Sequence, residues 1–185
     1  YIDLYCERVA PGLFGEPLNA LTNLLFLLAA YVLARRLTEG DSRGRWDDWL
    51  LISLVALVGG GSLVFHVLAT RPTSVLDKLF IALFIWTFFH RFLTRVAGLG
   101  APGAAVGVLL FIAASWGLGR IVPPDALNGS MLYLPAVLGL AGVAGWTAAK
   151  HRPGSTLFVG ATAVFVIAIA FRSIDLAVCA AFPLG

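Results

Sequence analysis

Three residues that could carry out chemistry lie close together in a strongly apolar part of the sequence. Ser62 and His66 are one helical turn apart, and Asp77 follows at the start of the next apolar stretch. An ionisable side chain inside a bilayer is costly, so its default interpretation is functional. Imidazole is a common zinc ligand, a carboxylate can accept a proton from water, and a hydroxyl can stabilise an oxyanion. This set of residues therefore suggests metal-assisted hydrolysis.

Each of these residues also has a purely structural interpretation. A single histidine in a membrane helix is often a hydrogen-bonded packing residue, and the serine could lie in a helix contact beside the small residues Gly59-Gly60-Gly61. A carboxylate at the start of a helix is favoured by the helix dipole. The zinc site is also incomplete from spacing alone, because we expect His90 and His151 at the opposite face of the membrane.

The composition indicates an all-α, polytopic membrane helix bundle. The chain has 185 residues, of which 59% are hydrophobic and 12% charged, and its mean hydropathy is +0.91. These values exclude a soluble domain and a disordered chain. Apolar stretches of about 20 residues, enough to cross a bilayer, recur throughout, so we expect one transmembrane domain over residues 1–185. The six expected spans are Pro17–Leu33, Trp49–Ala69, Val75–Leu93, Ala101–Leu118, Met131–Ala149 and Thr156–Phe182.

The distribution of Lys and Arg predicts the orientation. Eight of these residues lie at or after the ends of the first, third and fifth spans, and four lie in the N-terminal segment or at the other span ends and loops. By the positive-inside rule the first group is cytoplasmic and the N-terminus lies outside. The net charge of +3 then reflects topology and not nucleic-acid binding. The eight are Arg35, Arg36, Arg43, Arg45, Arg91, Arg95, Lys150 and Arg152, and the four are Arg8, Arg71, Lys78 and Arg120.

With this orientation, the polar residues of several spans are expected at one depth, in the outer half of the membrane. They are Glu16, Asn19, Asn23, Ser62, His66, Asp77, Arg172 and Asp175. Arg172 and Asp175 are three residues apart on a helix and are predicted to form a structural ion pair. Unrelated polar residues would be scattered through both leaflets, so the shared depth favours a functional site.

Three sequence blocks are distinctive together. They are Ser62-x3-His66 followed by Asp77, Tyr5-Cys6-Glu7 followed by Glu16-Pro17-Leu18-Asn19-Ala20-Leu21-Thr22-Asn23, and Asp175-Leu176-Ala177-Val178-Cys179. In this order they resemble the alkaline ceramidase family, within the wider group of seven-helix membrane hydrolases that includes the progestin and adiponectin receptors. The resemblance covers most of the chain.

The resemblance implies a zinc site. His66 would be a zinc ligand, Asp77 the base that orients water, and Ser62 the oxyanion partner. The other two ligands would come from a His-x3-His motif opening a seventh helix, which we expect beyond Gly185. The six spans and the non-Met start favour a truncated chain. The implied reaction is cleavage of the amide bond of a ceramide-like lipid to a fatty acid and a sphingoid-type base.

The resemblance also implies a calcium site in the N-terminal segment. Its ligands would be the carbonyl of Tyr5 and the side chains of Glu7 and Glu16, with Asp3 as a substitute. Oxygen ligands of this kind suit a hard cation. The segment departs from the family pattern at Arg8-Val9, which replaces polar residues. A solvated acidic N-terminus is the alternative interpretation.

A disulfide between Cys6 and Cys179 is a further implication of the resemblance. Topology places both cysteines outside, in an oxidising space where disulfides persist.

The leading hypothesis is therefore a membrane-embedded, zinc-dependent amidohydrolase in a bacterial plasma membrane, whose lipid substrate enters from the outer leaflet. The Ala- and Gly-rich sequence suggests a bacterial source, and another lipid amide or ester stays open as substrate. One alternative is a non-catalytic receptor or scaffold. Another is a transporter with a proton relay through His66, Asp77 and the pair Arg172–Asp175. The oligomeric state is left open.

Overall fold

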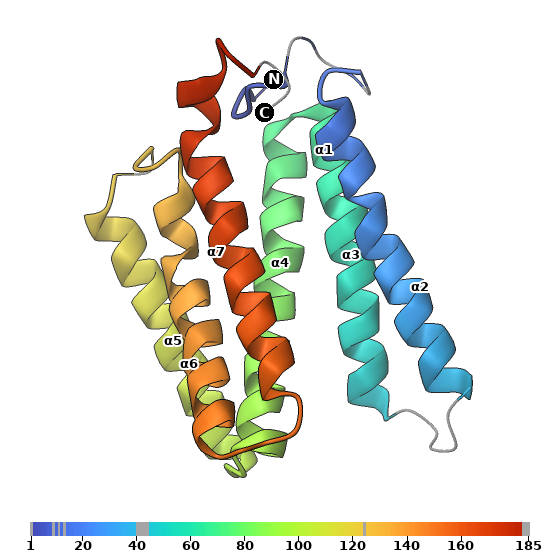
Figure 1. The fold of residues 1–185 in the computed structure, drawn as a ribbon, viewed down its shortest axis with the longest axis vertical. Coiled ribbons are helices and arrows are strands. Elements are labelled where there is room, and N and C mark those ends of the chain that lie inside the picture. Colours follow the sequence, from blue (N-terminus) through green and yellow to red (C-terminus); the bar gives the residue numbers. More distant parts are fainter. Residues whose placement is uncertain are drawn as a thin grey trace. The chain divides into compact units, whose positions relative to one another are not determined.

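The computed structural model describes residues 2–8, 10, 12, 14–39, 45–123 and 125–182, and the regular structure in these ranges is helical. This confirms the predicted all-α class. Arg43 and Gly185, used in the sequence predictions, lie outside the described residues. The elements are α1 (Pro17–Thr22), α2 (Leu24–Glu39), α3 (Trp46–Leu68), α4 (Arg71–Arg91), the π-helical turn η1 (Phe92–Val96), α5 (Ala101–Ile121), the 3-10 turn η2 (Ser130–Tyr133), α6 (Leu134–Ala149) and α7 (Ser155–Val178) (Figure 1).

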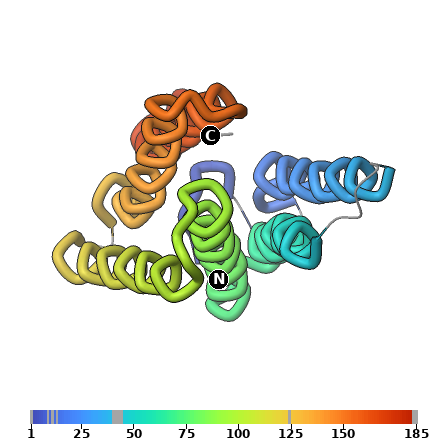
Figure 2. Tube along the Cα trace, turned by 90° about the horizontal axis from the view of Figure 1, so that it is seen from below, coloured from blue at the N-terminus to red at the C-terminus, as the bar shows by residue number. Residues whose placement is uncertain are grey.

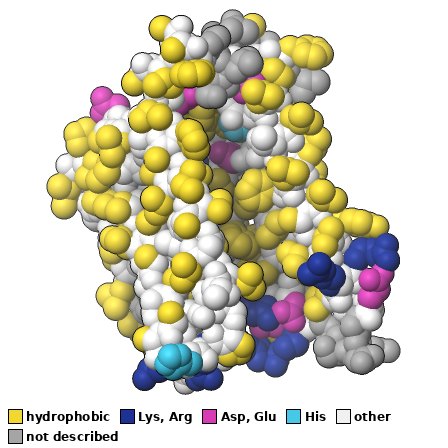
Figure 3. All heavy atoms as spheres, viewed as in Figure 1, with side chains coloured by type: hydrophobic (Ala, Val, Ile, Leu, Met, Phe, Trp, Pro, Cys, Tyr) yellow, Lys and Arg dark blue, Asp and Glu magenta, His cyan; other side chains and the backbone are white. Residues whose placement is uncertain are grey.

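Six segments of the described residues are long and apolar enough to cross a membrane, which confirms the predicted number of spans. In Figure 3 hydrophobic side chains are spread over the visible helix surface, as expected for helices that face lipid. The protein is accordingly an integral membrane protein. The segments are Pro17–Glu39, Trp46–Leu68, Arg71–Val96, Ala101–Ile121, Ser130–Ala149 and Ser155–Val178.

The ends of several spans differ from the predicted ends, and the start of the second span has a local reason. The second span begins at Trp46, earlier than the predicted Trp49, because the side chain of Asp48 accepts a hydrogen bond from the backbone N–H of Arg45 at 3.0 Å. Such a bond satisfies a backbone donor that the helix itself cannot pair. The last helix ends at Val178 and not at Phe182.

The chain divides into two compact units, residues 1–89 with 183–185 and residues 90–182, and each is described by itself. In the first unit α2 packs along α3, and α1 contacts both. In the second unit α6 and α7 pack along each other, and α5 contacts η1, η2 and α6. Both pairings can be followed in Figures 1 and 2. The prediction of a single domain stays a prediction.

Two glycines of α3 allow close helix contacts in the first unit. A Cβ atom on Gly59 would lie 2.8 Å from Cβ of Phe26 and 3.0 Å from the carbonyl oxygen of Asn23. A Cβ atom on Gly61 would lie 2.7 Å from the ring of Phe80 on α4. Outside the nearby backbone of α3, no atom of the described residues lies within 4 Å of such an atom on Gly60. Small residues let membrane helices approach closely, and here two positions of the run have that role.

The first span is interrupted at Asn23, between α1 and α2. The amide nitrogen of the Asn23 side chain donates to the carbonyl of Asn19 at 2.7 Å, and the hydroxyl of Thr22 donates to the same carbonyl at 3.1 Å. Side chains that bond nearby backbone groups compete with the regular helical pattern. Asn23 is buried, so the interruption lies inside the first unit and not at its surface.

The N-terminal segment covers the end of α3. The backbone N–H groups of Ile2 and Gly12 donate to the carbonyls of Ala69 (2.6 Å) and Val67 (3.1 Å). Ala69 itself has a left-handed backbone conformation, with φ of 48°, and ends the helix. The last carbonyls of a helix have no partner within it. The N-terminal segment supplies partners here, and this attaches it to the helix that carries His66.

In the second unit, Arg172 of α7 contacts the chain around η2. The side-chain amide of Asn128 donates to the carbonyl of Arg172 at 3.0 Å, and the guanidinium lies 5.7 Å from the centre of the Tyr133 ring. Asp175, one turn further on, is buried. The predicted ion pair between Arg172 and Asp175 stays a prediction.

Both cysteines of the chain are disulfide-bonded, and they are bonded to each other. The predicted Cys6–Cys179 disulfide is therefore confirmed.

Candidate functional site

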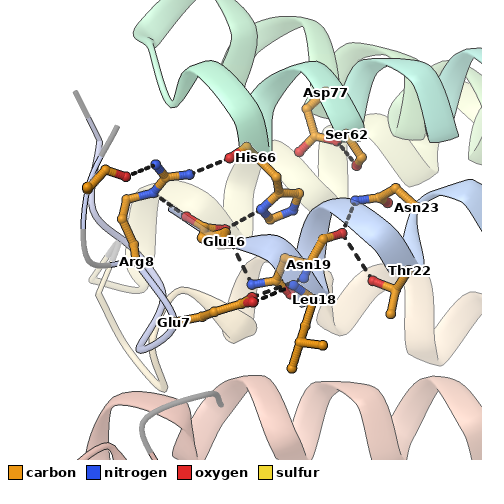
Figure 4. A network of polar contacts seen from close by, with 11 residues as sticks. Glu7, Arg8, Glu16, Leu18, Asn19, Thr22, Asn23, Ser62, His66 and Asp77 are labelled. Carbon is orange, nitrogen blue, oxygen red and sulfur yellow. Dashed lines mark hydrogen bonds and ion pairs between the residues drawn. The ribbon is translucent and has the colours of Figure 1, made fainter. Parts of the chain in front are cut away.

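The end of α3 and the start of α4 bring Ser62 and Asp77 together. The hydroxyl of Ser62 donates a hydrogen bond to Oδ1 of Asp77 (Figure 4). Ser62 is buried, and Asp77 is half-buried. Gly61 makes this approach possible, since a side chain there would collide with Phe80 of α4. His66 follows Ser62 by one turn on the same face of α3 and is also buried.

His66 is held by Glu16, one of the residues predicted to bind calcium. Nδ1 of the imidazole is hydrogen-bonded to Oε2 of Glu16, just before α1. Glu16 has a relative exposure of only 1%. Because a carboxylate can only accept, Nδ1 carries the hydrogen, and in the neutral imidazole the lone pair is then on Nε2. In Figure 4 Glu16 reaches the imidazole from one side, and the Ser62–Asp77 pair lies on the other.

Arg8 balances the charge of Glu16. Its Nε donates to Oε1 of Glu16, and both side chains are almost completely buried, at 0% and 1% exposure. Nη2 donates to the carbonyl of His66 at 2.7 Å, and Nη1 donates to the carbonyl of Ala10 at 3.2 Å. A buried charge is costly unless it is paired and hydrogen-bonded, and Arg8 meets both conditions. The guanidinium also lies at the C-terminal end of α3, where the helix dipole favours a cation.

Glu7 acts on the start of α1. Its two carboxylate oxygens accept hydrogen bonds from the backbone N–H groups of Leu18 and, at 3.0 Å, Asn19. These are unpaired donors of the first helical turn, and the helix dipole favours a negative charge there. The side chain of Glu16, at the N-cap position, makes no capping bond and is instead directed to Arg8 and His66. Glu7 therefore takes over the capping role.

Two aromatic rings pack on the imidazole of His66. The centres of the rings of Tyr5 and Phe65 lie 5.2 and 5.3 Å from the centre of the imidazole, both in tilted arrangements. Phe65 is buried and Tyr5 is half-buried. These contacts and the bond to Glu16 restrict the orientation of the ring.

His66 fits the place of one zinc ligand. A histidine ligand usually donates its other ring N–H to a carboxylate or carbonyl, which fixes the tautomer and the ring orientation. Nδ1 of His66 has such a partner in Glu16, and Nε2 makes no hydrogen bond to another described residue. Within the described ranges no group of three or more His, Cys, Asp or Glu side chains could hold a metal ion. His90 and His151 belong to the second unit, where His151 is exposed.

The acidic residues predicted to bind calcium do not fit a calcium ion as they are arranged here. Every carboxylate oxygen of Glu7 and Glu16 already accepts a hydrogen bond from the protein. The carbonyl of Tyr5 accepts the backbone N–H of Arg8 at 3.1 Å, and Asp3 is exposed. A divalent cation beside these groups would be repelled by the guanidinium of Arg8, which is bound to Glu16.

Comparisons with protein-family models, with curated proteins and with solved structures give no match for this chain. The resemblance to the alkaline ceramidases stays a prediction.

Proposed function

We propose that this chain is a membrane-embedded, zinc-dependent amidohydrolase that cleaves the amide bond of ceramide-like lipids. The observation that supports the proposal is the arrangement of His66, oriented through Nδ1 by Glu16, beside the hydrogen-bonded pair Ser62–Asp77. The proposal assigns His66 as one ligand of a zinc site, which needs about three protein ligands. When bound, zinc would supply Lewis-acid activation of water and of the scissile carbonyl.

Asp77 would act as the base. Its Oδ1 accepts the hydrogen bond from Ser62, and its Oδ2 makes no hydrogen bond to another described residue. Oδ2 can therefore orient a water molecule and take its proton. An anionic carboxylate accepts a hydrogen bond more strongly than a neutral carboxylic acid does. Taking up the proton thus changes what Asp77 offers to Ser62.

This change gives Ser62 its role in the reaction. A hydroxyl has a single hydrogen, so Ser62 cannot donate to Asp77 and to an oxyanion at the same time. Once Oδ2 holds the proton, Oδ1 is an uncharged carbonyl oxygen and a weaker acceptor. The hydroxyl hydrogen of Ser62 can then turn toward the developing oxyanion. The donor then becomes available at the stage at which the negative charge forms.

The surface of the protein suits a lipid substrate. Large apolar side chains such as Leu25 of α2 and Leu79 of α4 are 63% and 44% exposed. We place the site in the outer half of a bacterial plasma membrane, on the basis of the Lys and Arg distribution, and the substrate would enter sideways from the outer leaflet. Another lipid amide or ester is an alternative substrate of the same chemistry.

The test uses the full-length protein in lipid nanodiscs. Release of fatty acid and sphingoid base from a long-chain ceramide is measured by mass spectrometry, and bound zinc by elemental analysis, for wild type and His66→Ala. His151→Asn is the matched control, because His151 is exposed and its φ of 49° suits asparagine. We expect wild type and control to bind zinc and hydrolyse ceramide, and His66→Ala to lose both. Equal zinc in all three proteins would reject the site.

The rival functions give different results in the same experiment. A non-catalytic receptor or scaffold would release no product even with zinc bound. A proton-coupled transporter would show substrate flux in proteoliposomes that continues after a chelator has removed the metal.

A further inference from the structure

Arg8, Glu16 and His66 form a closed ring of hydrogen bonds. Nε of Arg8 bonds the carboxylate of Glu16, and the same carboxylate bonds Nδ1 of His66. Nη2 of Arg8 returns to the backbone carbonyl of His66 at 2.7 Å. The guanidinium is thus linked both to the main chain of the histidine and, through Glu16, to its side chain (Figure 4).

We propose that Arg8 is a positioning residue that acts as a built-in cation: it holds Glu16 against His66 and makes this site independent of calcium. The part that concerns zinc rests on the function proposed above. The part that concerns calcium and stability rests on the contacts of the first unit alone.

The first reason is charge. Glu7 and Glu16 are both buried, at 4% and 1% exposure, and buried carboxylates need compensation. Glu7 obtains it from the N-terminus of α1, through the N–H groups of Leu18 and Asn19. Glu16 obtains it from Arg8. Both charges are satisfied by groups of the chain itself, so no divalent cation is required.

The second reason is geometry. A guanidinium is a planar fork with several N–H donors in fixed directions, whereas an ammonium is a point charge on a flexible stem. Arg8 uses three nitrogens for three acceptors, which are the Glu16 carboxylate and the carbonyls of His66 and Ala10. A lysine could neutralise Glu16 but could not bond all three acceptors in the same directions. The role therefore requires arginine and not only a positive charge.

The third reason is the effect on His66. Outer partners of a histidine ligand fix its tautomer and orientation, and their loss commonly lowers metal affinity by about 10–100-fold. Glu16 can fix the ring only if its own position is fixed. Arg8 and the side-chain amide of Asn19, which donates to Oε2 of Glu16 at 3.3 Å, hold the carboxylate in place.

The experiment compares the full-length wild type with Arg8→Gln and Arg8→Lys, and uses Arg35→Gln as the matched control. Arg35 is also paired with a glutamate, Glu39, but both side chains are more than half exposed, at 57% and 56%. Thermal unfolding in detergent is followed in millimolar Ca²⁺ and in EGTA. We expect the wild-type Tm to be the same in both buffers, Arg8→Gln to melt several degrees lower, and the control to match wild type.

Two further measurements address His66. Zinc affinity, by competition with a chelating dye, is expected to fall about 10–100-fold in Arg8→Gln and less in Arg8→Lys. The ¹⁵N chemical shifts of the histidine ring nitrogens, assigned with His66→Ala, report the tautomer even if no zinc binds. We expect the Nδ1–H form in wild type and a mixture of forms in Arg8→Gln.

A wild-type Tm that rises with Ca²⁺ would overturn the proposal, and so would an unchanged tautomer in Arg8→Gln. If Arg8→Gln does not fold, the same measurements are made on Arg8→Lys. Histidine ¹⁵N shifts and a Tm equal to those of wild type in Arg8→Lys would reject the positioning role of Arg8. The hydrolase proposal fails separately if the wild type binds no zinc and cleaves no ceramide. In that case Arg8→Gln would still lower the Tm and change the tautomer of His66.

Discussion

Glu16 accepts a hydrogen bond from Nδ1 of His66, although the two residues are 50 positions apart in the chain. The contact joins the segment before α1 to the end of α3, and Arg8 closes it from the other side. Glu16, at the border of the first span, thereby decides which nitrogen of His66 can face a ligand.

Replacing Glu16 should destabilise the protein strongly. Glu16→Gln keeps an oxygen that can accept from Nδ1 of His66 but leaves the guanidinium of Arg8 buried without its counter-charge. Breaking a buried ion pair in this way costs about 3–5 kcal/mol. Thermal unfolding measures the loss. The control is Glu39→Gln, whose partner Arg35 is exposed, and it should melt like wild type. Equal Tm values for both variants would contradict the role of Glu16.

Removing the hydroxyl of Ser62 should slow hydrolysis and spare the fold. Ser62→Ala loses the donor to Asp77 and, in the proposed reaction, the donor to the oxyanion. The loss of one oxyanion donor typically lowers kcat by about 10²–10³-fold. Ser53→Ala, an exposed serine on the same helix, is the control. Steady-state turnover of ceramide by both variants checks the prediction, and an undiminished kcat in Ser62→Ala would rule out the assigned role.

Two neighbouring glycines of α3 should respond in opposite ways. Gly59→Ala places a methyl group 2.8 Å from Cβ of Phe26, and overpacking of this kind costs about 1–3 kcal/mol. Gly60→Ala meets nothing within 4 Å and should be neutral or stabilising by up to about 1 kcal/mol, because alanine favours helix more than glycine does. The Tm of each variant gives the comparison. Similar losses in both would show that helix contacts are not the reason for the glycine run.

Glu7 should stabilise α1 through its carboxylate. Glu7→Gln removes the charge facing the first helical turn and weakens the bonds to the N–H groups of Leu18 and Asn19. Loss of a helix cap typically costs about 1 kcal/mol. Asp3→Asn, which alters an exposed carboxylate of the same segment, serves as the control. Hydrogen exchange of the Leu18 and Asn19 amides should accelerate in Glu7→Gln alone.

Loss of the disulfide should lower stability independently of the charge network. Cys6→Ser breaks the bond to Cys179, and removal of a native disulfide typically costs about 2–5 kcal/mol. The Tm of Cys6→Ser should be insensitive to a reductant, whereas that of wild type should fall when the bond is reduced. Mass mapping of peptides under non-reducing conditions checks the pairing, and free thiols at both positions would refute it.

The sequence by itself determined the six spans, their approximate limits and the candidate polar residues. Hydropathy over about 20 residues is a local property, and a bilayer imposes hydrogen-bonded helices on such stretches whatever their neighbours are. Ser62 and His66 could be assigned to one face because the helical period alone relates them.

Only the tertiary structure decided how the polar residues are connected. In the sequence, Glu16 and Glu7 are two acidic residues that suit a cation, and Arg8 is one basic residue outside the spans. In the fold, Arg8 binds Glu16, Glu16 binds His66, and Glu7 caps α1. Hydrogen-bond partners depend on distance and direction between segments far apart in the chain, and no local pattern carries that information. For the same reason, the sequence could not distinguish Gly59 and Gly61, which lie against neighbouring helices, from Gly60, which does not.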